Sequence, residues 1–216
     1  MFKNTTCPMI VDYGSGNIRS VVKAFEYVIG NEVLSTNNPL DLDKASHIVL
    51  PGVGAFADCK NGLLAFPGLE DELIKQVIEK QKPFLGICVG MQLMATVGLE
   101  YGKTAGFDWI KGQIEKIKPN RKELKIPHMG WNELIFHEPP HPVLSGFLGS
   151  PHAYFVHSYR FVVADSAHVL ASVTYGDVIP AIVGRDNLIG TQFHPEKSQK
   201  FGIEFIKKFL NWDGAQ

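Results

Sequence analysis

One cysteine of this chain stands in a sequence context that favours nucleophilic chemistry. Cys88 ends an apolar run and is flanked by Gly86 and Gly90 in the string LGICVGMQ. A nucleophile on a sharp turn from a strand into a helix has a strained backbone, and small neighbours let that turn close. The helix start favours the thiolate and brings the N–H of Val89 next to a developing oxyanion. A buried cysteine behind a tight turn fits the same string.

A histidine and a glutamate further along the chain are candidates for the base and the orienting group that a thiol nucleophile requires. Among the eight histidines, His194 stands in the string QFHPEK, two residues before Glu196. Residues i and i+2 of an extended segment project to the same side, so the carboxylate can fix the imidazole tautomer. A surface His–Glu pair near a strand end is the alternative for this string alone. Together with the cysteine turn, the pair predicts a Cys–His–Glu triad.

A glycine-rich string, PGVGAF, is the candidate for the second half of an oxyanion hole. It directly follows the apolar run at 47–50. Active sites in open α/β sheets lie beyond the carboxyl ends of the strands, and both this string and Cys88 stand at such ends. A backbone N–H from this loop can therefore complete the hole. An ordinary glycine-rich turn is the alternative.

Alternating strand and helix patterns position these residues in the first half of the chain. Buried strands are predicted at 9–11, 47–50 and 83–87. Helices are predicted at 18–29, at 69–81, and from the cysteine turn to about Val97. This alternation is typical of βαβ units and a parallel sheet.

The second half of the chain is richer in strands. They are predicted near 109–117, 154–161, 168–174, 179–184 and 188–193. One more helix is predicted at 201–210 and is expected to pack back on the sheet. We therefore expect an α/β fold with an antiparallel extension, in a single domain that covers residues 1–216.

The composition excludes several classes of protein. Of the 216 residues, 45% are hydrophobic and 20% are charged, which excludes intrinsic disorder. A net charge of -1 gives no general attraction to nucleic acid or anionic membranes. The three cysteines form no CxxC pair, which argues against a disulfide framework and a zinc site. No apolar run has signal-peptide length or approaches the ~20 residues that cross a bilayer. We expect a cytoplasmic protein with no nucleic-acid or membrane partner.

The strings LGICVGMQ, PGVGAF and FHPEKS together resemble the class I glutamine amidotransferases, which use a Cys–His–Glu triad on an α/β fold. Three further strings, VDYGSGN, PHMGWN and YFVHSY, are similar to the glutaminase subunits of imidazole glycerol phosphate synthase. The resemblance covers nearly the whole chain. It implies a three-layer sandwich with a mostly parallel central sheet.

The resemblance also implies a role for individual residues. The thiolate of Cys88 attacks the carboxamide of glutamine, His194 moves protons, and Glu196 orients His194. The oxyanion donors are the N–H groups of Val53 and Val89. The glutamine pocket is formed by Gly52, Gln92, His157 and Ser158. The interface with the partner includes Asn17, Met129, Trp131 and Lys197.

A partner is implied by the same resemblance. Ammonia would pass to a separate cyclase subunit, a (β/α)8 barrel, in a heterodimer that serves histidine biosynthesis. Such a barrel needs ~250 residues, for which this chain has no room. No metal or organic cofactor is implied.

Three alternatives to this function remain. The first is another class I amidotransferase subunit, serving aromatic or pyridoxal synthesis, against which PHMGWN and DYGSGN argue. The second is a cysteine peptidase or amidase, which needs an open cleft for extended chains where a glutaminase needs a small closed pocket. The third is a non-enzymatic interaction module, for which Cys88→Ala would change no turnover.

Overall fold

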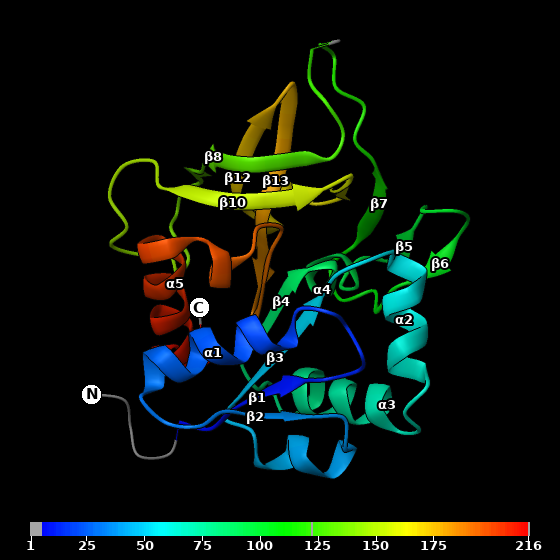
Figure 1. Ribbon diagram of the computed structural model, residues 1–216, viewed down its shortest axis with the longest axis vertical. Helices are drawn as coiled ribbons and strands as arrows, with labels where there is room; N and C mark the ends of the chain where they lie inside the picture. Colours follow the sequence, from blue (N-terminus) through cyan, green and yellow to red (C-terminus); the bar gives the residue numbers. More distant parts are fainter. Residues whose placement is uncertain (1–5, 122, 216) are drawn as a thin grey trace.

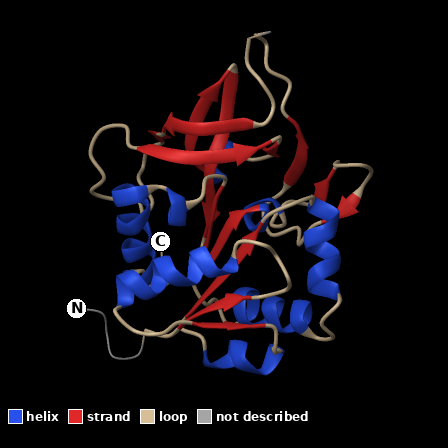
Figure 2. Ribbon diagram, viewed as in Figure 1, coloured by secondary structure: helices blue, strands red, loops and turns tan. Residues whose placement is uncertain are grey.

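In the computed structural model, which describes residues 6–121 and 123–215, an eight-stranded sheet runs through the centre of the molecule (Figure 2). The strand order is β2-β1-β3-β4-β14-β13-β12-β9. The first five strands in this order pair in parallel: β2 (Leu34–Thr36), β1 (Pro8–Val11), β3 (His47–Gly52), β4 (Phe84–Cys88) and β14 (Leu188–Thr191). The other three pair antiparallel: β13 (Asp177–Arg185), β12 (Val169–Tyr175) and β9 (Ile135–Phe136). The expected parallel sheet with an antiparallel extension is confirmed.

The register of the parallel strands brings three chain segments to one edge of the sheet. In β3, β4 and β14 every residue is buried, as expected for strands covered on both faces. Gly52 pairs with Cys88 at the ends of β3 and β4, and Thr191 at the end of β14 pairs with Ile87. The PGVGAF loop, the cysteine turn and the segment that leads to His194 therefore leave the sheet at the same edge.

Helices cover both faces of this sheet and complete three layers. Figure 1 shows α1 (Ile18–Ile29) and α5 (Gln199–Asn211) together on one side of the parallel strands. On the other side lie α2 (Phe56–Leu64) and α3 (Leu69–Ile74), which continues into the π-helical turn η2 (Lys75–Glu79). The remaining helices are short: α4 (Val89–Gln92) and the 3₁₀ turns η1 (Pro39–Lys44), η3 (Ser166–His168) and η4 (Pro195–Lys197). Among the described residues, no helix combines the length and apolarity that crossing a membrane requires.

Two smaller sheets flank the antiparallel half. One pairs β8 (His128–Glu133) with β10 (His152–His157), which lie across β12 and β13 in Figure 1. The other has the order β11 (Tyr159–Val163), β7 (Gly112–Lys116), β5 (Val97–Gly98) and β6 (Thr104–Ala105). The segment 154–161, which the sequence predicts as one strand, is therefore two strands in different sheets, because the chain changes direction at Ser158.

The predicted helix from the cysteine turn to Val97 is wrong, since α4 ends at Gln92. The carbonyls of Leu93, Met94 and Ala95 accept hydrogen bonds from the N–H groups of Phe107, Ile110 and Asp108, at 2.7 to 3.0 Å. These acceptors are thus no longer available to extend the helix. The chain instead turns into β5, where Val97 is already extended.

Candidate active site

Cys88 lies in a strained backbone conformation at the turn from β4 into α4. Its φ of 55° and ψ of -109° are unusual for a residue with a side chain. The glycines on either side allow close backbone packing: a Cβ on Gly90 would lie 1.8 Å from the carbonyl oxygen of Leu50, and one on Gly86 would lie 2.7 Å from the backbone of Gly90. Only glycine at these positions lets α4 start directly against β3. The turn therefore places the buried cysteine just beyond the carboxyl end of β4.

His194 and Glu196 form a buried pair beside this turn. His194 Nδ1 and Glu196 Oε1 are 2.7 Å apart, and their side chains are 1% and 0% exposed. The contact arises because Glu196 lies in the 3₁₀ turn η4 that follows His194, and not through alternation along an extended strand. Asn17 Nδ2 donates a second hydrogen bond to the same carboxylate oxygen. The imidazole is thus oriented by a carboxylate that is itself held in place.

The environment of His194 favours its charged form. Burial lowers the pKa of His194, but Cys88 and Glu196 outweigh this effect, so the pKa is raised above its usual value. Because Nδ1 donates to Glu196, Nε2 is the nitrogen that is left for proton transfer. Nε2 is buried and forms no hydrogen bond of normal geometry with any described residue, although the sulfur of Cys88 is close enough to act on it. The arrangement can pass a proton between the thiol, the imidazole and a bound substrate.

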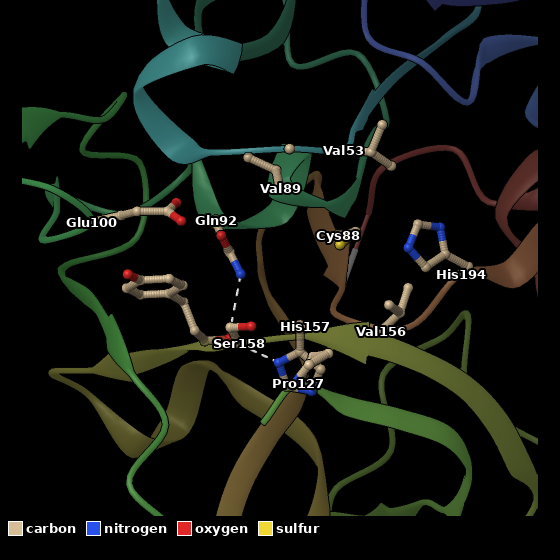
Figure 3. Close-up of a pocket in the computed structure, with 12 residues that line it drawn as sticks. Val53, Cys88, Val89, Gln92, Glu100, Pro127, Val156, His157, Ser158 and His194 are labelled. Atoms are coloured by element: carbon tan, nitrogen blue, oxygen red, sulfur yellow. Dashed lines mark hydrogen bonds between the residues drawn. The ribbon is translucent and has the colours of Figure 1, made fainter. Parts of the chain in front are cut away.

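Cys88 and His194 line a cavity of about 300 Å³. This volume is at the lower end of the ~300–1,000 Å³ that is usual for small-molecule sites. Figure 3 shows Cys88 and His194 toward one end of the cavity and Glu100 toward the other. The full lining comprises Val53, Gly54, Cys88, Val89, Gln92, Glu100, Pro127, Val156, His157, Ser158, Tyr159 and His194.

Glu100 is a cavity residue that the sequence did not reveal. It follows β5, and its Oε2 accepts a hydrogen bond of 2.8 Å from the N–H of Phe56 at the start of α2. The carboxylate gives the cavity a negative group opposite the thiol, where it can bind a cation. No local signal pointed to it, since its place depends on the unexpected end of α4 and on a contact 44 residues away.

The two predicted oxyanion donors are in different states. Val89 provides the first N–H of α4, directly after the nucleophile, where a helix leaves its N–H groups without intrahelical partners. The N–H of Val53 instead donates to the hydroxyl of Ser15, at 3.1 Å. Both residues line the cavity. In this conformation, only the donor from Val89 is available to a substrate.

Of the four residues predicted for the glutamine pocket, three line the cavity. Gln92, His157 and Ser158 line the cavity, but Gly52 does not. A Cβ on Gly52 would lie 2.7 Å from the backbone nitrogen of Gly90, so this glycine serves close packing beneath the cavity. Both ring nitrogens of His157 are bonded within the protein, to the carbonyl of Tyr159 and to His128. Any contact of His157 with a substrate must therefore be made by its ring carbons or its backbone.

The predicted interface residues surround the His194 segment. Met129 and Trp131 are 61% and 46% exposed on β8, and Lys197 is exposed in η4. Strand β8 pairs with β10, whose Tyr154 carbonyl accepts the N–H of His194. Asn17 is half-buried because its side chain reaches Glu196. It can therefore orient the triad whether or not it meets a partner.

The other two cysteines lie outside the cavity lining. Cys7 is exposed, and Cys59 is buried with its sulfur donating to the carbonyl of Val53. Burial raises the pKa of the Cys59 thiol to about 11, which keeps it protonated. Within residues 6–121 and 123–215, no three histidine, cysteine or acidic side chains gather to form a metal site.

Comparison with known proteins agrees with this geometry. The model of the class-I glutamine amidotransferase family matches residues 9–212, and the chain belongs to that family. Its curated relatives include imidazole glycerol phosphate synthase subunits HisH. The protein of Cereibacter sphaeroides is 50% identical over 208 residues, which cover 94% of this chain and 98% of the relative. That of Rhodospirillum rubrum is 49% identical over 208 residues, with 94% and 97% covered.

Solved structures share the fold at much lower sequence identity. The crystal structure of a glutamine amidotransferase superposes with a TM-score of 0.71 at 20% identity, covering 94% of this chain and 99% of that one. PurLQS from Thermotoga maritima gives a TM-score of 0.68 at 21% identity, covering 98% and 99%. At this identity, the likeness concerns the fold alone. It confirms the expected α/β class.

Proposed function

We propose that this chain is the glutaminase subunit of an imidazole glycerol phosphate synthase, and that it hydrolyses glutamine through Cys88, His194 and Glu196 in a single amidotransferase domain. The observation that carries the proposal is the buried His194–Glu196 pair beside a strained cysteine in a small cavity. The membership of the family and the full-length similarity to HisH subunits support the same reaction.

The first half of the reaction forms a thioester. The Cys88 thiolate attacks the carboxamide carbon of glutamine, and the carbonyl π electrons move to the oxygen. The N–H of Val89 stabilises this oxyanion, and the N–H of Val53 joins it once released from Ser15. The C–N bond then breaks, and His194 Nε2–H gives its proton to the departing ammonia.

The second half restores the enzyme. His194 Nε2, now neutral, takes a proton from a water molecule as the water oxygen attacks the thioester. The C–S bond breaks, glutamate leaves, and the sulfur takes the electron pair. Glu196 accepts the Nδ1–H of His194 throughout, which keeps Nε2 directed at the reacting atoms.

The cavity is suited to a free amino acid. We assign the α-ammonium group of glutamine to the carboxylate of Glu100, which faces the thiol from the far end of the cavity (Figure 3). Gln92 and Ser158 lie between these two ends and add polar groups. A volume of about 300 Å³ leaves little room for an extended peptide, which argues against the peptidase alternative.

The partner of this subunit is a cyclase with a (β/α)8 barrel, and we place its docking surface around Met129, Trp131, Lys197 and Asn17. Large apolar side chains that are exposed together are typical of interaction surfaces. This surface adjoins the His194 segment through β8 and β10. In this arrangement, the diffusion path of ammonia from Cys88 to the partner is short.

A glutaminase assay in the presence of the cyclase subunit tests the function. Cys88→Ala should reduce glutamine turnover by more than about 10³-fold, because no other group in the cavity can form the thioester. Cys7→Ala is the matched control and should retain activity, since Cys7 is exposed and outside the cavity. Retained turnover in Cys88→Ala, or release of products from peptides and none from glutamine, would contradict the proposal.

A further inference from the structure

Gln192 has no role in the mechanism so far, yet its side chain touches the nucleophile. It follows β14, two residues before His194, and is 0% exposed. Its Nε2 donates a hydrogen bond of 3.6 Å to the sulfur of Cys88, a normal length for a sulfur acceptor. The backbone N–H of Gln192 donates to the carbonyl of Ala181 on the neighbouring strand, so the residue is anchored in the sheet.

The orientation of the Gln192 amide follows from its neighbours. Gln192 Oε1 accepts a hydrogen bond from Gln92 Nε2 at 3.0 Å. Gln92 Nε2 also lies 3.5 Å from the carbonyl oxygen of Tyr159. A carbonyl oxygen can only accept, so the amino group of Gln92 must face Tyr159. The oxygen of Gln192 must then face Gln92. The amino group of Gln192 is the only end left to face the sulfur.

A chain of neutral histidines holds the far end of this arrangement. The carbonyl of Tyr159 also accepts from His157 Nδ1 at 2.8 Å, so His157 Nε2 must accept from His128 Nδ1, at 2.9 Å. Asn132 Nδ2 completes the chain by donating to His128 Nε2. Burial lowers the pKa of His157 to about 3 and that of His128 to about 4, so both stay neutral near pH 7 and keep these tautomers. The donor that faces the sulfur is therefore built into the fold.

We propose that Gln192 is a further catalytic residue, whose amide N–H stabilises the Cys88 sulfur as a thiolate. A neutral thiol is a weak acceptor, whereas a thiolate forms a stronger, charge-assisted hydrogen bond. A fixed donor therefore favours the charged form. The same N–H stabilises the sulfur when it leaves as the C–S bond of the thioester breaks. This inference rests on the proposed glutaminase function.

Alkylation of the free enzyme measures the thiolate without glutamine turnover. Iodoacetamide reacts with the thiolate, so the rate at Cys88, followed by mass spectrometry of its peptide across pH, gives a titration midpoint. Gln192→Met keeps the length of the side chain but removes the donor, and should raise the midpoint by about one pH unit. Gln192→Glu keeps the acceptor for Gln92 but places a carboxylate near the sulfur, and should raise the midpoint further. Both should lower kcat/KM for glutamine by about 10-fold or more.

Gln76→Met is the matched control. Gln76 is also 0% exposed, but it donates to Glu72 and Asp43, away from the cavity. Its replacement should leave the alkylation midpoint unchanged. The ionisable side chains near Cys88 are those of His194, Glu196, Tyr13, Cys59, His157 and Glu100, and all are retained in every variant.

The outcomes separate this inference from the proposed function. An unchanged midpoint in folded Gln192→Met, or in Gln192→Glu if the first does not fold, would overturn the role of Gln192 while wild-type glutamine hydrolysis stood. Absence of glutamine hydrolysis in the wild-type complex would overturn the proposed function, and the alkylation midpoints would still decide whether Gln192 stabilises the thiolate.

Discussion

The carboxylate of Glu196 serves two partners, because one oxygen accepts from both His194 and Asn17. This shared contact fixes the imidazole without requiring the carboxylate to touch substrate. In our mechanism, therefore, Glu196 orients and His194 transfers protons. The distinction can be measured.

We expect Glu196→Gln to lower kcat less than His194→Asn does. Loss of a general acid–base group costs about 10² to 10⁴ in rate, whereas a glutamine at 196 can still accept from Nδ1 through its amide oxygen. The assay uses saturating glutamine with the cyclase present. Equal or inverted losses in kcat would show that the two roles are wrongly assigned.

We also expect a glutamine-like electrophile to label Cys88 alone. Cys88 lines the cavity, whereas Cys59 is buried with a pKa raised to about 11, and Cys7 is exposed but outside the cavity lining. Mass spectrometry after substoichiometric labelling identifies the modified thiol. Preferential labelling of Cys7 or Cys59 would contradict the assignment, and excess glutamine should protect Cys88.

At the scale of the elements, the loop after β3 links the N-terminal turn to the oxyanion site. Ser15 precedes α1 and accepts a hydrogen bond from the Val53 N–H, which we assign to the oxyanion hole. Gly54 follows with a φ of 106°, a conformation that glycine adopts without strain. A partner that docks near Asn17 would thus meet the segment that controls this donor. The Ser15–Val53 contact is thus a physical means of coupling glutamine hydrolysis to docking.

Ser15→Ala should raise the glutaminase kcat of the free subunit, because Val53 loses its acceptor and can turn toward the oxyanion. One oxyanion donor is worth about 10² to 10³ in kcat, which sets an upper limit on the gain. The complex with the cyclase should gain much less, because in this account docking has already released the Val53 N–H from Ser15. A free subunit whose kcat is unchanged by Ser15→Ala would show that this hydroxyl does not restrain the loop.

The exposed side chains of strand β8 allow a test of the docking surface. Trp131→Ala should weaken binding of the cyclase by about 10-fold or more, because large exposed aromatic residues often dominate interfaces. Val178→Ala is the control, since Val178 is 64% exposed on β13 but was not assigned to the interface. Isothermal titration calorimetry of each variant compares the two. Equal weakening, or none at Trp131, would place the docking surface elsewhere.

For the whole molecule, three buried histidines make stability depend on pH. Burial lowers the pKa of His128 and His141 to about 4 and that of His157 to about 3. In the unfolded chain these groups titrate near 6.5. The unfolded state therefore binds more protons as the pH falls below 6.5, and the free energy of unfolding decreases until the folded-state pKa values are reached.

Between pH 7 and pH 5, each of these histidines should remove about 2 kcal/mol from the free energy of unfolding. Urea denaturation at pH 7, 6 and 5 measures this decrease. His141→Asn is the test variant, because His141 lies outside the active-site cavity, and it should lose less stability between pH 7 and pH 5 than the wild type does. A pH dependence equal to that of the wild type would show that His141 is not buried in its neutral form.

The sequence by itself determined the strands that carry the site, the helix at 18–29, and the three triad candidates. Apolar runs and helical spacing act within one element, and the string around His194 holds its orienting carboxylate only two residues away. The tertiary structure decided the rest: the end of α4, the place of Glu100, and the contacts Asn17–Glu196, Ser15–Val53 and Gln192–Cys88, which join residues 179, 38 and 104 positions apart. Such contacts depend on strand register and on which distant N–H groups donate hydrogen bonds to each carbonyl oxygen. A local sequence pattern predicts neither the register nor these hydrogen-bond partners, because both form only when the strands of the sheet come together.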